Sequence, residues 1–85
     1  MRRYEDSIEI NETALKRAPN NVFAHMHSAA AYSALGREED AHRHAEEVLR
    51  LDPEFSLKQL AEMSPVKDKA EVERYIDNLR KAGLK

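Results

Sequence analysis

The chain has 85 residues, no cysteine and a net charge of −2 at neutral pH, with an isoelectric point near 6.1. This length allows one small domain, and the slight negative charge argues against nucleic-acid binding, which needs a basic surface. The absence of cysteine is typical of a reducing compartment, and the apolar stretches are too short to span a bilayer. The first residues also lack the apolar segment of a signal peptide. We therefore expect a cytoplasmic protein that binds neither nucleic acid nor membrane.

Apolar spacing and stop signals predict three helices in the first part of the chain. These helices should span residues 4–18, 22–35 and 38–51. Pro19-Asn20-Asn21 ends the first helix and offers a side-chain cap to the second. Gly36 ends the second helix in a left-handed conformation, and Asp52-Pro53 stops the third.

Capping-box patterns predict two further helices in the last third of the chain. Ser56-Leu57-Lys58-Gln59 opens a short helix that runs to about Met63, where Ser64-Pro65 breaks it. Asp68-Lys69-Ala70-Glu71 opens a last helix that ends at Gly83, and Leu84 can fold back onto it. One face of this last helix carries the apolar residues Val72, Tyr75, Ile76 and Leu79. No strand signal competes, so the sequence predicts an all-α protein of five helices.

An internal repeat is visible because Pro19 and Pro53 lie 34 residues apart and the residues before them align. Six residues before Pro19 correspond to six before Pro53, namely Tyr4, Ser7, Ile8, Asn11, Ala14 and Leu15 to Glu38, Ala41, His42, Ala45, Val48 and Leu49. A fixed period in this range is the signature of a helical repeat array, in which each unit buries its apolar face against its neighbours. Such arrays present a groove to another polypeptide and seldom catalyse reactions.

The block 20–53 resembles a tetratricopeptide repeat (TPR), a helix–turn–helix unit of about 34 residues. The matching positions are Ala24, Ala29, Tyr32, Gly36, Ala41, Ala45, Leu49 and Asp52-Pro53. His25, Ser28 and Ala45 depart from the family, which favours tryptophan, leucine and an aromatic residue there. The resemblance implies small residues at the close contact of two antiparallel helices, with Tyr32 packed across them.

The resemblance also implies a domain organisation. We expect a single domain over 1–85, a TPR-type α-solenoid of antiparallel helix pairs with a C-terminal capping helix. Residues 1–19 would form the second helix of an incomplete repeat, and 20–53 a complete repeat. Residues 54–85 would hold a partial repeat and the capping helix.

The C-terminal tail resembles the end of TPR regions in certain bacterial multidomain proteins, many of which carry a class III adenylate/guanylate cyclase domain or a winged-helix regulator domain. The segments that carry this resemblance are 64–68, 73–76 and 79–84. Val66 departs from it, because an aromatic residue usually precedes the Lys-Asp pair. The resemblance implies the carboxyl end of a longer protein, or a separate relative of one. No cyclase residue is present in the sequence itself.

Four histidines raise the question of a metal site. His25 and His27, like His42 and His44, are two residues apart, which places their side chains about 200° apart on a helix. Neither pair can therefore bind one ion from a single helix. A cross-helix site that combines His25 or His27 with His44 lacks cysteine and a clear carboxylate at ligand spacing. A small metal-binding protein is thus the remote alternative, and we expect histidines that pack or face solvent.

Catalysis has no better support in the sequence. The serines are explained by helix caps and close helix contacts, and no Gly-x-Ser-x-Gly turn is present. Glu38-Glu39-Asp40 stands at a predicted helix start, where carboxylates complement the helix dipole. We therefore expect no catalytic residue, no metal and no cofactor, and the chain is not expected to be an enzyme.

In TPR arrays the first helix of each repeat lines the concave groove. The residues at those positions here are Phe23, Met26, His27, Ala30 and Ser33. Two positions of the family's clamp for chaperone C-terminal carboxylates are Met26 and Ala30, so such a clamp is not expected. Phe23 and Met26 instead indicate an apolar strip that could take a helix or extended peptide. The alternative is that a neighbouring helix covers both side chains.

Self-association is a further expectation. The first helix lacks the partner helix of a complete repeat, so we expect one of its flanks to be open. This flank would carry Tyr4, Ile8, Asn11 and Leu15, and a homodimer through the N-terminal helices would cover it. Overall, the sequence predicts a module that binds a protein or peptide. The alternative is a C-terminal regulatory or assembly segment of a bacterial cyclase-like enzyme.

Overall fold

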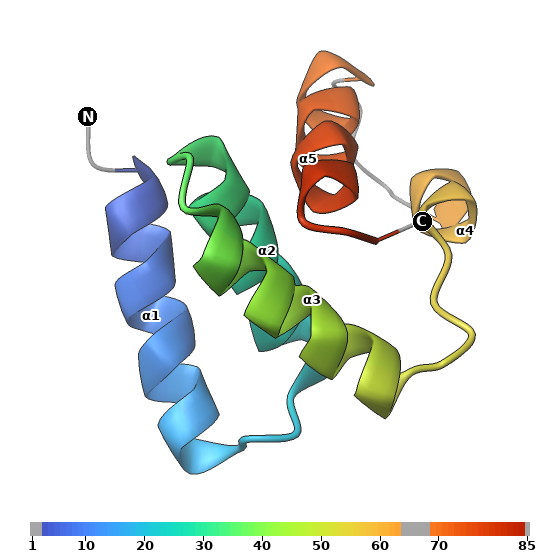
Figure 1. Ribbon diagram of the computed structural model, residues 1–85. Helices are drawn as coiled ribbons and strands as arrows, with labels where there is room; N and C mark the ends of the chain where they lie inside the picture. Colours follow the sequence, from blue (N-terminus) through green and yellow to red (C-terminus); the bar gives the residue numbers. More distant parts are fainter. Residues whose placement is uncertain (1–2, 64–68, 85) are drawn as a thin grey trace.

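The computed structural model describes residues 3–63 and 69–84, and these residues form five α-helices and no strand (Figure 1). The helices are α1 (Arg3–Arg17), α2 (Val22–Ala34), α3 (Glu38–Leu51), α4 (Leu57–Met63) and α5 (Lys69–Lys81). The prediction of an all-α fold is confirmed, and the predicted helix limits agree closely with the observed ones. The break at Ser64-Pro65 and the cap at Asp68 lie outside the described residues.

Local signals in the sequence fix both ends of α2. The Asn21 side chain accepts hydrogen bonds from the backbone N–H groups of Phe23 (3.1 Å) and Ala24 (3.2 Å), as expected of a helix cap. Gly36 has a φ of +78°, which a residue with a side chain rarely adopts. This conformation lets the N–H of Arg37 donate to the carbonyl of Tyr32 at 2.9 Å, which closes the helix end.

The C-terminal end of α5 is closed in the same way, by a glycine with a positive φ and a backbone hydrogen bond from the residue after it. Gly83 has a φ of +111°, and the N–H of Leu84 donates to the carbonyl of Leu79 at 3.1 Å. The Leu79 and Leu84 side chains are 0% and 1% exposed. The predicted return of Leu84 onto the helix is therefore confirmed, and the two leucines fasten the C-terminal end of α5 to the core.

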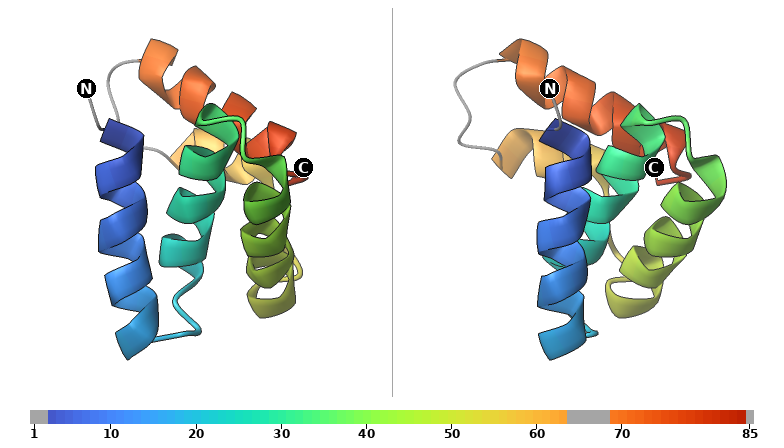
Figure 2. Two further views of the ribbon diagram at one scale, coloured as in Figure 1. Left: turned by 60° about the vertical axis from the view of Figure 1, so that its left-hand side comes forward. Right: turned by 90° about the vertical axis from the view of Figure 1, so that its left-hand side faces the viewer.

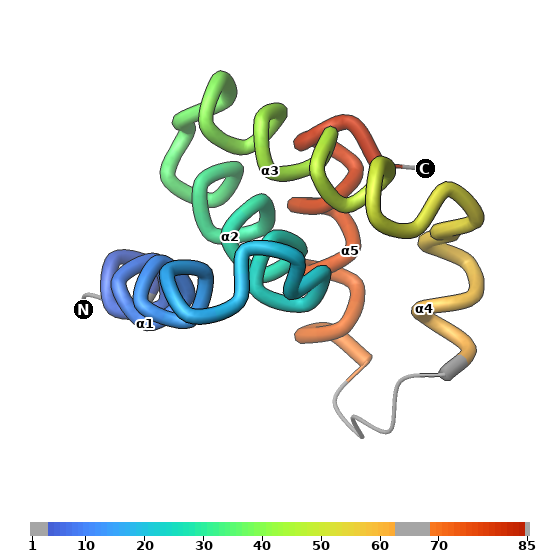
Figure 3. The backbone as a smooth tube through the Cα atoms, turned by 90° about the horizontal axis from the view of Figure 1, so that it is seen from below, coloured from blue at the N-terminus to red at the C-terminus, as the bar shows by residue number. Residues whose placement is uncertain are grey.

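Helix α2 is the centre of the fold, with α1, α3 and α5 all packed against it (Figures 1 and 3). Helices α2 and α3 form an antiparallel pair joined by a short turn. Their close approach needs small side chains, and Ala29 and Ala41 are both fully buried there, as predicted. Tyr32 is buried as well. These helices form a compact all-α fold, which is consistent with the TPR-type arrangement that the sequence predicts.

Helix α5 crosses the layer of α1, α2 and α3 (Figure 2). Its apolar face is the predicted one, since Ile76 and Leu79 are buried and Val72 and Tyr75 are partly buried against the core. At its C-terminal end, a Cβ atom on Gly83 would lie 3.1 Å from the His42 ring, so α5 closely approaches the start of α3. Within the described residues, no helix has the length and apolar character needed to cross a membrane.

Candidate functional site

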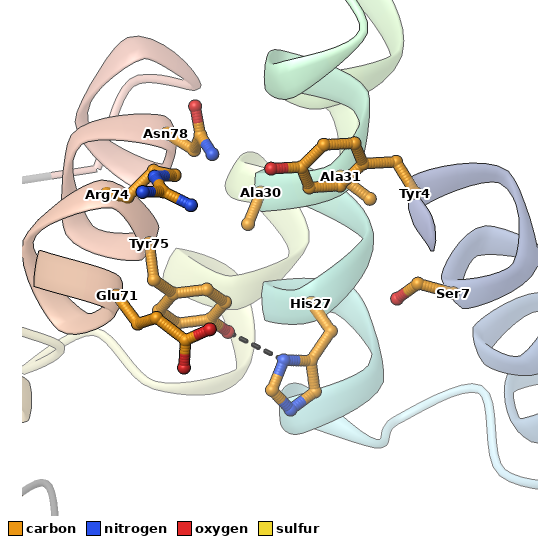
Figure 4. Close-up of a pocket in the computed structure, with 9 residues that line it drawn as sticks. All are labelled: Tyr4, Ser7, His27, Ala30, Ala31, Glu71, Arg74, Tyr75 and Asn78. Carbon is orange, nitrogen blue, oxygen red and sulfur yellow. Dashed lines mark hydrogen bonds between the residues drawn. The ribbon is translucent and has the colours of Figure 1, made fainter. Parts of the chain in front are cut away.

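A cleft of about 210 Å³ opens between α1, α2 and α5 (Figure 4). Its lining residues come from all three helices and are Tyr4, Ser7, His27, Ala30, Ala31, Glu71, Arg74, Tyr75 and Asn78. The two alanines of α2 form its floor, and most of the polar side chains belong to the flanking helices (Figure 4). The cleft is therefore a polar site built on a small apolar floor.

Helical periodicity explains why these residues share one space. Tyr4 and Ser7 are three residues apart on α1, so both face α2. On α5, Glu71, Arg74 and Asn78 follow at spacings of three and four and form one stripe along the cleft. The floor stays low because alanine has no side chain beyond Cβ. Larger residues at these two positions would fill the space.

His27 and Tyr75 tie α2 to α5 at one end of the cleft. The Tyr75 hydroxyl and His27 Nδ1 are 2.7 Å apart, and the rings are tilted with centroids 5.6 Å apart. Burial lowers the pKa of His27 and raises the pKa of Tyr75, so both groups are neutral at neutral pH. The phenol is thus the donor and the imidazole Nδ1 the acceptor. This bond positions two side chains without supplying a charge.

The structure distributes the five residues of the predicted groove over different surroundings. His27 and Ala30 line the cleft, whereas Phe23 is 65% exposed and is not part of it. Met26 is buried at 5% exposure, so neighbouring residues cover it, but they do not cover Phe23. Ser33 is half-buried, and its hydroxyl has no hydrogen-bond partner among the described residues. A binding role for these five residues stays a prediction.

The predicted self-association residues all belong to α1 but differ in exposure. Ile8 and Asn11 are buried, and Tyr4 and Leu15 are partly buried. The expected open flank therefore does not contain Ile8 or Asn11, because α1 packs on α2 through this side. A homodimer through these residues stays a prediction, and it would have to displace contacts within the chain. The large apolar side chain that α1 exposes is Ile10, at 68%.

Sequence reasoning did not identify the contribution of α5 to the cleft. Arg74 and Asn78 were available as a signal, because their spacing of four residues places them together on a helix face. Nothing in the sequence, however, showed that this polar face would lie against α2 near Tyr4. That placement depends on how α5 crosses the other helices.

A second polar cluster lies on the side of α2 that faces α3. We call it the closed cluster, because its side chains bond to one another and to the backbone. His25 Nε2 lies 2.9 Å from the carbonyl of Pro19, and His25 Nδ1 lies 3.0 Å from His44 Nδ1. Because a carbonyl only accepts, Nε2 carries a proton, and in the neutral ring Nδ1 accepts from His44. The His44 ring stacks on Tyr32 at 12° and 5.5 Å, and the Tyr32 hydroxyl donates to Glu12 at 3.0 Å.

This second cluster joins α1, α2 and α3 through hydrogen bonds and ring contacts. The cross-helix histidine pair that the sequence allowed is His25 with His44, but the two nitrogens share a hydrogen bond. Across residues 3–63 and 69–84, no group of three metal-binding side chains is present. The cluster thus has a structural role in positioning the helices.

Comparison with known proteins gives one similarity. The chain is 35% identical over 54 residues to the Hsp70-Hsp90 organizing protein 3 of Arabidopsis thaliana. The aligned part is 64% of this chain and 10% of that protein, so the chain spans about a tenth of its relative's length. No family model matches, and no solved structure matches significantly. None of these findings supports a link to nucleotide cyclases.

Proposed function

We propose that the chain is a protein-interaction module whose cleft between α1, α2 and α5 binds a segment of a partner protein. The main support is the composition of the cleft, in which three helices direct hydrogen-bonding side chains over an alanine floor. Backbone and polar side chains of an incoming segment need such donors and acceptors to replace water. The walls are held in place by helix packing, so little ordering is needed on binding.

The similarity to a protein named as an organizer of Hsp70 and Hsp90 supports the same functional class. It does not identify the partner, because the chain covers only a small part of that relative. A chaperone-carboxylate clamp is not part of the proposal. Met26 and Ala30, which occupy two of the clamp positions in the TPR resemblance, are 5% and 4% exposed and apolar.

A pair of tryptophan variants on α1 tests this proposal. Ser7 lines the cleft, and Ser7→Trp would fill part of it, whereas Glu9 is exposed on another face of the same helix. Tagged wild-type chain and both variants are used to capture partners from the cells that express the protein. We expect the wild type and Glu9→Trp to retain the same partner and Ser7→Trp to lose it.

The result is read only for variants whose circular dichroism and thermal midpoint match the wild type. Retention of the partner by Ser7→Trp, or its loss from Glu9→Trp, would place the binding surface elsewhere. Capture of no protein by the wild type would contradict the interaction function. If the captured protein is a second copy of the chain, the module is a self-association module.

A further inference from the structure

We infer that one end of the cleft, formed by Tyr4, Arg74 and Asn78, receives a carboxylate side chain of the partner segment. The occupant would be an aspartate or glutamate within an acidic stretch of protein. This inference rests on the proposed function and names the chemistry that the cleft recognises. It adds a charged contact from the capping helix α5 to a groove that the repeat helices alone would line.

The first argument concerns the ion pairs of the arginines. Arg37, Arg43, Arg50 and Arg80 each pair with a carboxylate three residues away. Arg17 and Arg74 pair with no carboxylate among the described residues, and of these two only Arg74 lines the cleft. An arginine that borders a cleft and forms no ion pair with the described residues can give its charge to a ligand.

The second argument concerns convergence. Arg74 and Asn78 extend from α5 and Tyr4 extends from α1 towards the same part of the cleft, near Ala30 of α2 (Figure 4). A guanidinium presents paired N–H donors that match the two oxygens of a carboxylate. The amide N–H₂ and the phenol O–H can add neutral donors. These groups together form a donor-rich site for an anion.

The third argument concerns the distribution of charge along the cleft. Glu71 lies towards the other end, beside the His27–Tyr75 pair and away from Asn78 (Figure 4). His27 is neutral at neutral pH because burial lowers its pKa, so Arg74 supplies the positive charge in the lining. The donor end is therefore the end at which an anion is favoured.

The size of the cleft favours a side chain over a chain terminus. About 210 Å³ is below the range of roughly 300–1,000 Å³ that ligand pockets commonly have. A single Asp or Glu side chain fits such a space while its backbone stays outside. A C-terminal carboxylate is attached directly to a backbone that carries a further side chain, and so it brings more atoms into the same volume.

Three short peptides test the inference by NMR titration of the isotope-labelled chain. The first is acetylated and amidated and has a glutamate flanked by alanines. The second replaces this glutamate with glutamine, and the third contains only alanines and has a free C-terminal carboxylate. We expect the glutamate peptide to bind weakly, at millimolar concentration, and to shift the Asn78 side-chain amide and the Arg74 Nε–H signals. The glutamine and alanine peptides should produce smaller shifts at these positions.

Two arginine variants test whether the charge of Arg74 binds the glutamate side chain of the peptide. Arg74→Gln should weaken binding of the glutamate peptide by roughly fivefold, the upper range for an exposed charge pair. Arg80→Gln removes the same charge from an exposed position that pairs with Asp77, and it should leave the affinity unchanged. Both variants should keep the thermal midpoint within a few degrees, because neither side chain is buried.

The outcomes separate this inference from the proposed function. Equal shifts with the glutamate and glutamine peptides, at cleft residues, would overturn the carboxylate inference but leave a peptide-binding cleft. Tighter binding of the peptide with the free terminus would assign the site to chain ends and overturn the choice of a side chain. Equal losses in Arg74→Gln and Arg80→Gln would show a general charge effect and also overturn it. If no peptide shifts any cleft residue while the full-length partner still binds in the capture experiment, only the carboxylate inference fails.

Discussion

His25 and His27 lie two residues apart on α2, and their surroundings are opposite in character. His25 is 8% exposed, and both of its ring nitrogens have partners in the closed cluster with Pro19 and His44. His27 borders the open cleft and makes its hydrogen bond to Tyr75 on the capping helix. The same residue type thus packs within a polar cluster on one side of α2 and lines an open cleft on the other.

The difference comes from what covers each side of α2. The closed side faces α3, where small residues allow the backbones to approach and the polar groups to satisfy one another. The open side faces α5, which crosses α2 (Figure 2), and the cleft beside this crossing is lined by Ala30 and Ala31 (Figure 4). A crossing helix cannot follow α2 along its whole length, so a cleft remains beside the contact. The cleft therefore lies beside the crossing of α5 over α2.

The largest expected effect tests whether α5 is held firmly enough to form a cleft wall. Leu79 is a fully buried residue of α5, and Leu79→Ala should lower the free energy of unfolding by about 2–5 kcal/mol. Leu49, which is 41% exposed on α3, provides a matched control, and Leu49→Ala should cost well under half as much. Urea denaturation followed by circular dichroism measures both values. Equal effects would show that α5 is not anchored as described.

The next effect tests the close packing on the closed side. Ala41 is fully buried between α3 and α2, and Ala41→Leu should overpack this contact and cost about 1–3 kcal/mol. Ala61 is exposed on α4, so Ala61→Leu should leave the free energy of unfolding nearly unchanged. The two variants are compared by thermal denaturation. An unchanged midpoint in Ala41→Leu would contradict the repeat packing.

A pH titration tests both sides of α2 together. Burial lowers the pKa of His27 and of His44, and the nearby Arg43 guanidinium lowers the pKa of His44 further. The unfolded chain therefore binds more protons than the folded chain near and below pH 6.5, and the free energy of unfolding should fall as the pH falls. Each histidine contributes at most about 1.4 kcal/mol per pH unit to this slope.

The measurement is urea denaturation between pH 7.5 and 5.5, above the range in which carboxylates titrate. His27→Gln should reduce the slope by removing the contribution of the open side, and the remainder should come from the closed side. A flat profile in the wild type would contradict the neutral state of both histidines. A slope that His27→Gln leaves unchanged would restrict the effect to the closed cluster.

The smallest expected effect concerns the outer edge of the closed cluster. The Arg37 guanidinium lies 4.6 Å from the centre of the Tyr32 ring and also pairs with Asp40 at 2.7 Å. Arg43 pairs with the same carboxylate at 2.7 Å but has no ring contact among the described residues. Arg37→Gln should therefore cost about 0.5–1 kcal/mol more than Arg43→Gln. Equal losses of free energy of unfolding in the two variants would show that the contact between Arg37 and the Tyr32 ring does not stabilise the fold.

The sequence predicted the local structure well because its signals are local. Asn21, Gly36 and Gly83 act through backbone geometry within a few residues, and each behaves as expected. The small residues Ala29 and Ala41 also predicted the close contact of α2 and α3 correctly, since only small side chains allow two helices to approach closely.

The candidate site could be predicted only in part, because it depends on contacts between distant segments. The repeat pattern indicated His27 and Ala30 on α2, and both line the cleft. It could not indicate Arg74 or Asn78, because the crossing of α5 over α2 has no signature in either helix alone. The same reason explains Met26, since its burial depends on the packing of neighbouring elements.

The two histidines of α2 offer the most direct test of the central claim that one side of this helix packs and the other binds. The variants His25→Gln and His27→Gln are each measured twice, by urea denaturation and by retention of the captured partner at a temperature where both are folded. We predict that His25→Gln lowers the free energy of unfolding and keeps the partner, whereas His27→Gln weakens partner binding with a smaller loss of stability. Loss of the partner in His25→Gln alone, or full retention in His27→Gln, would contradict this account.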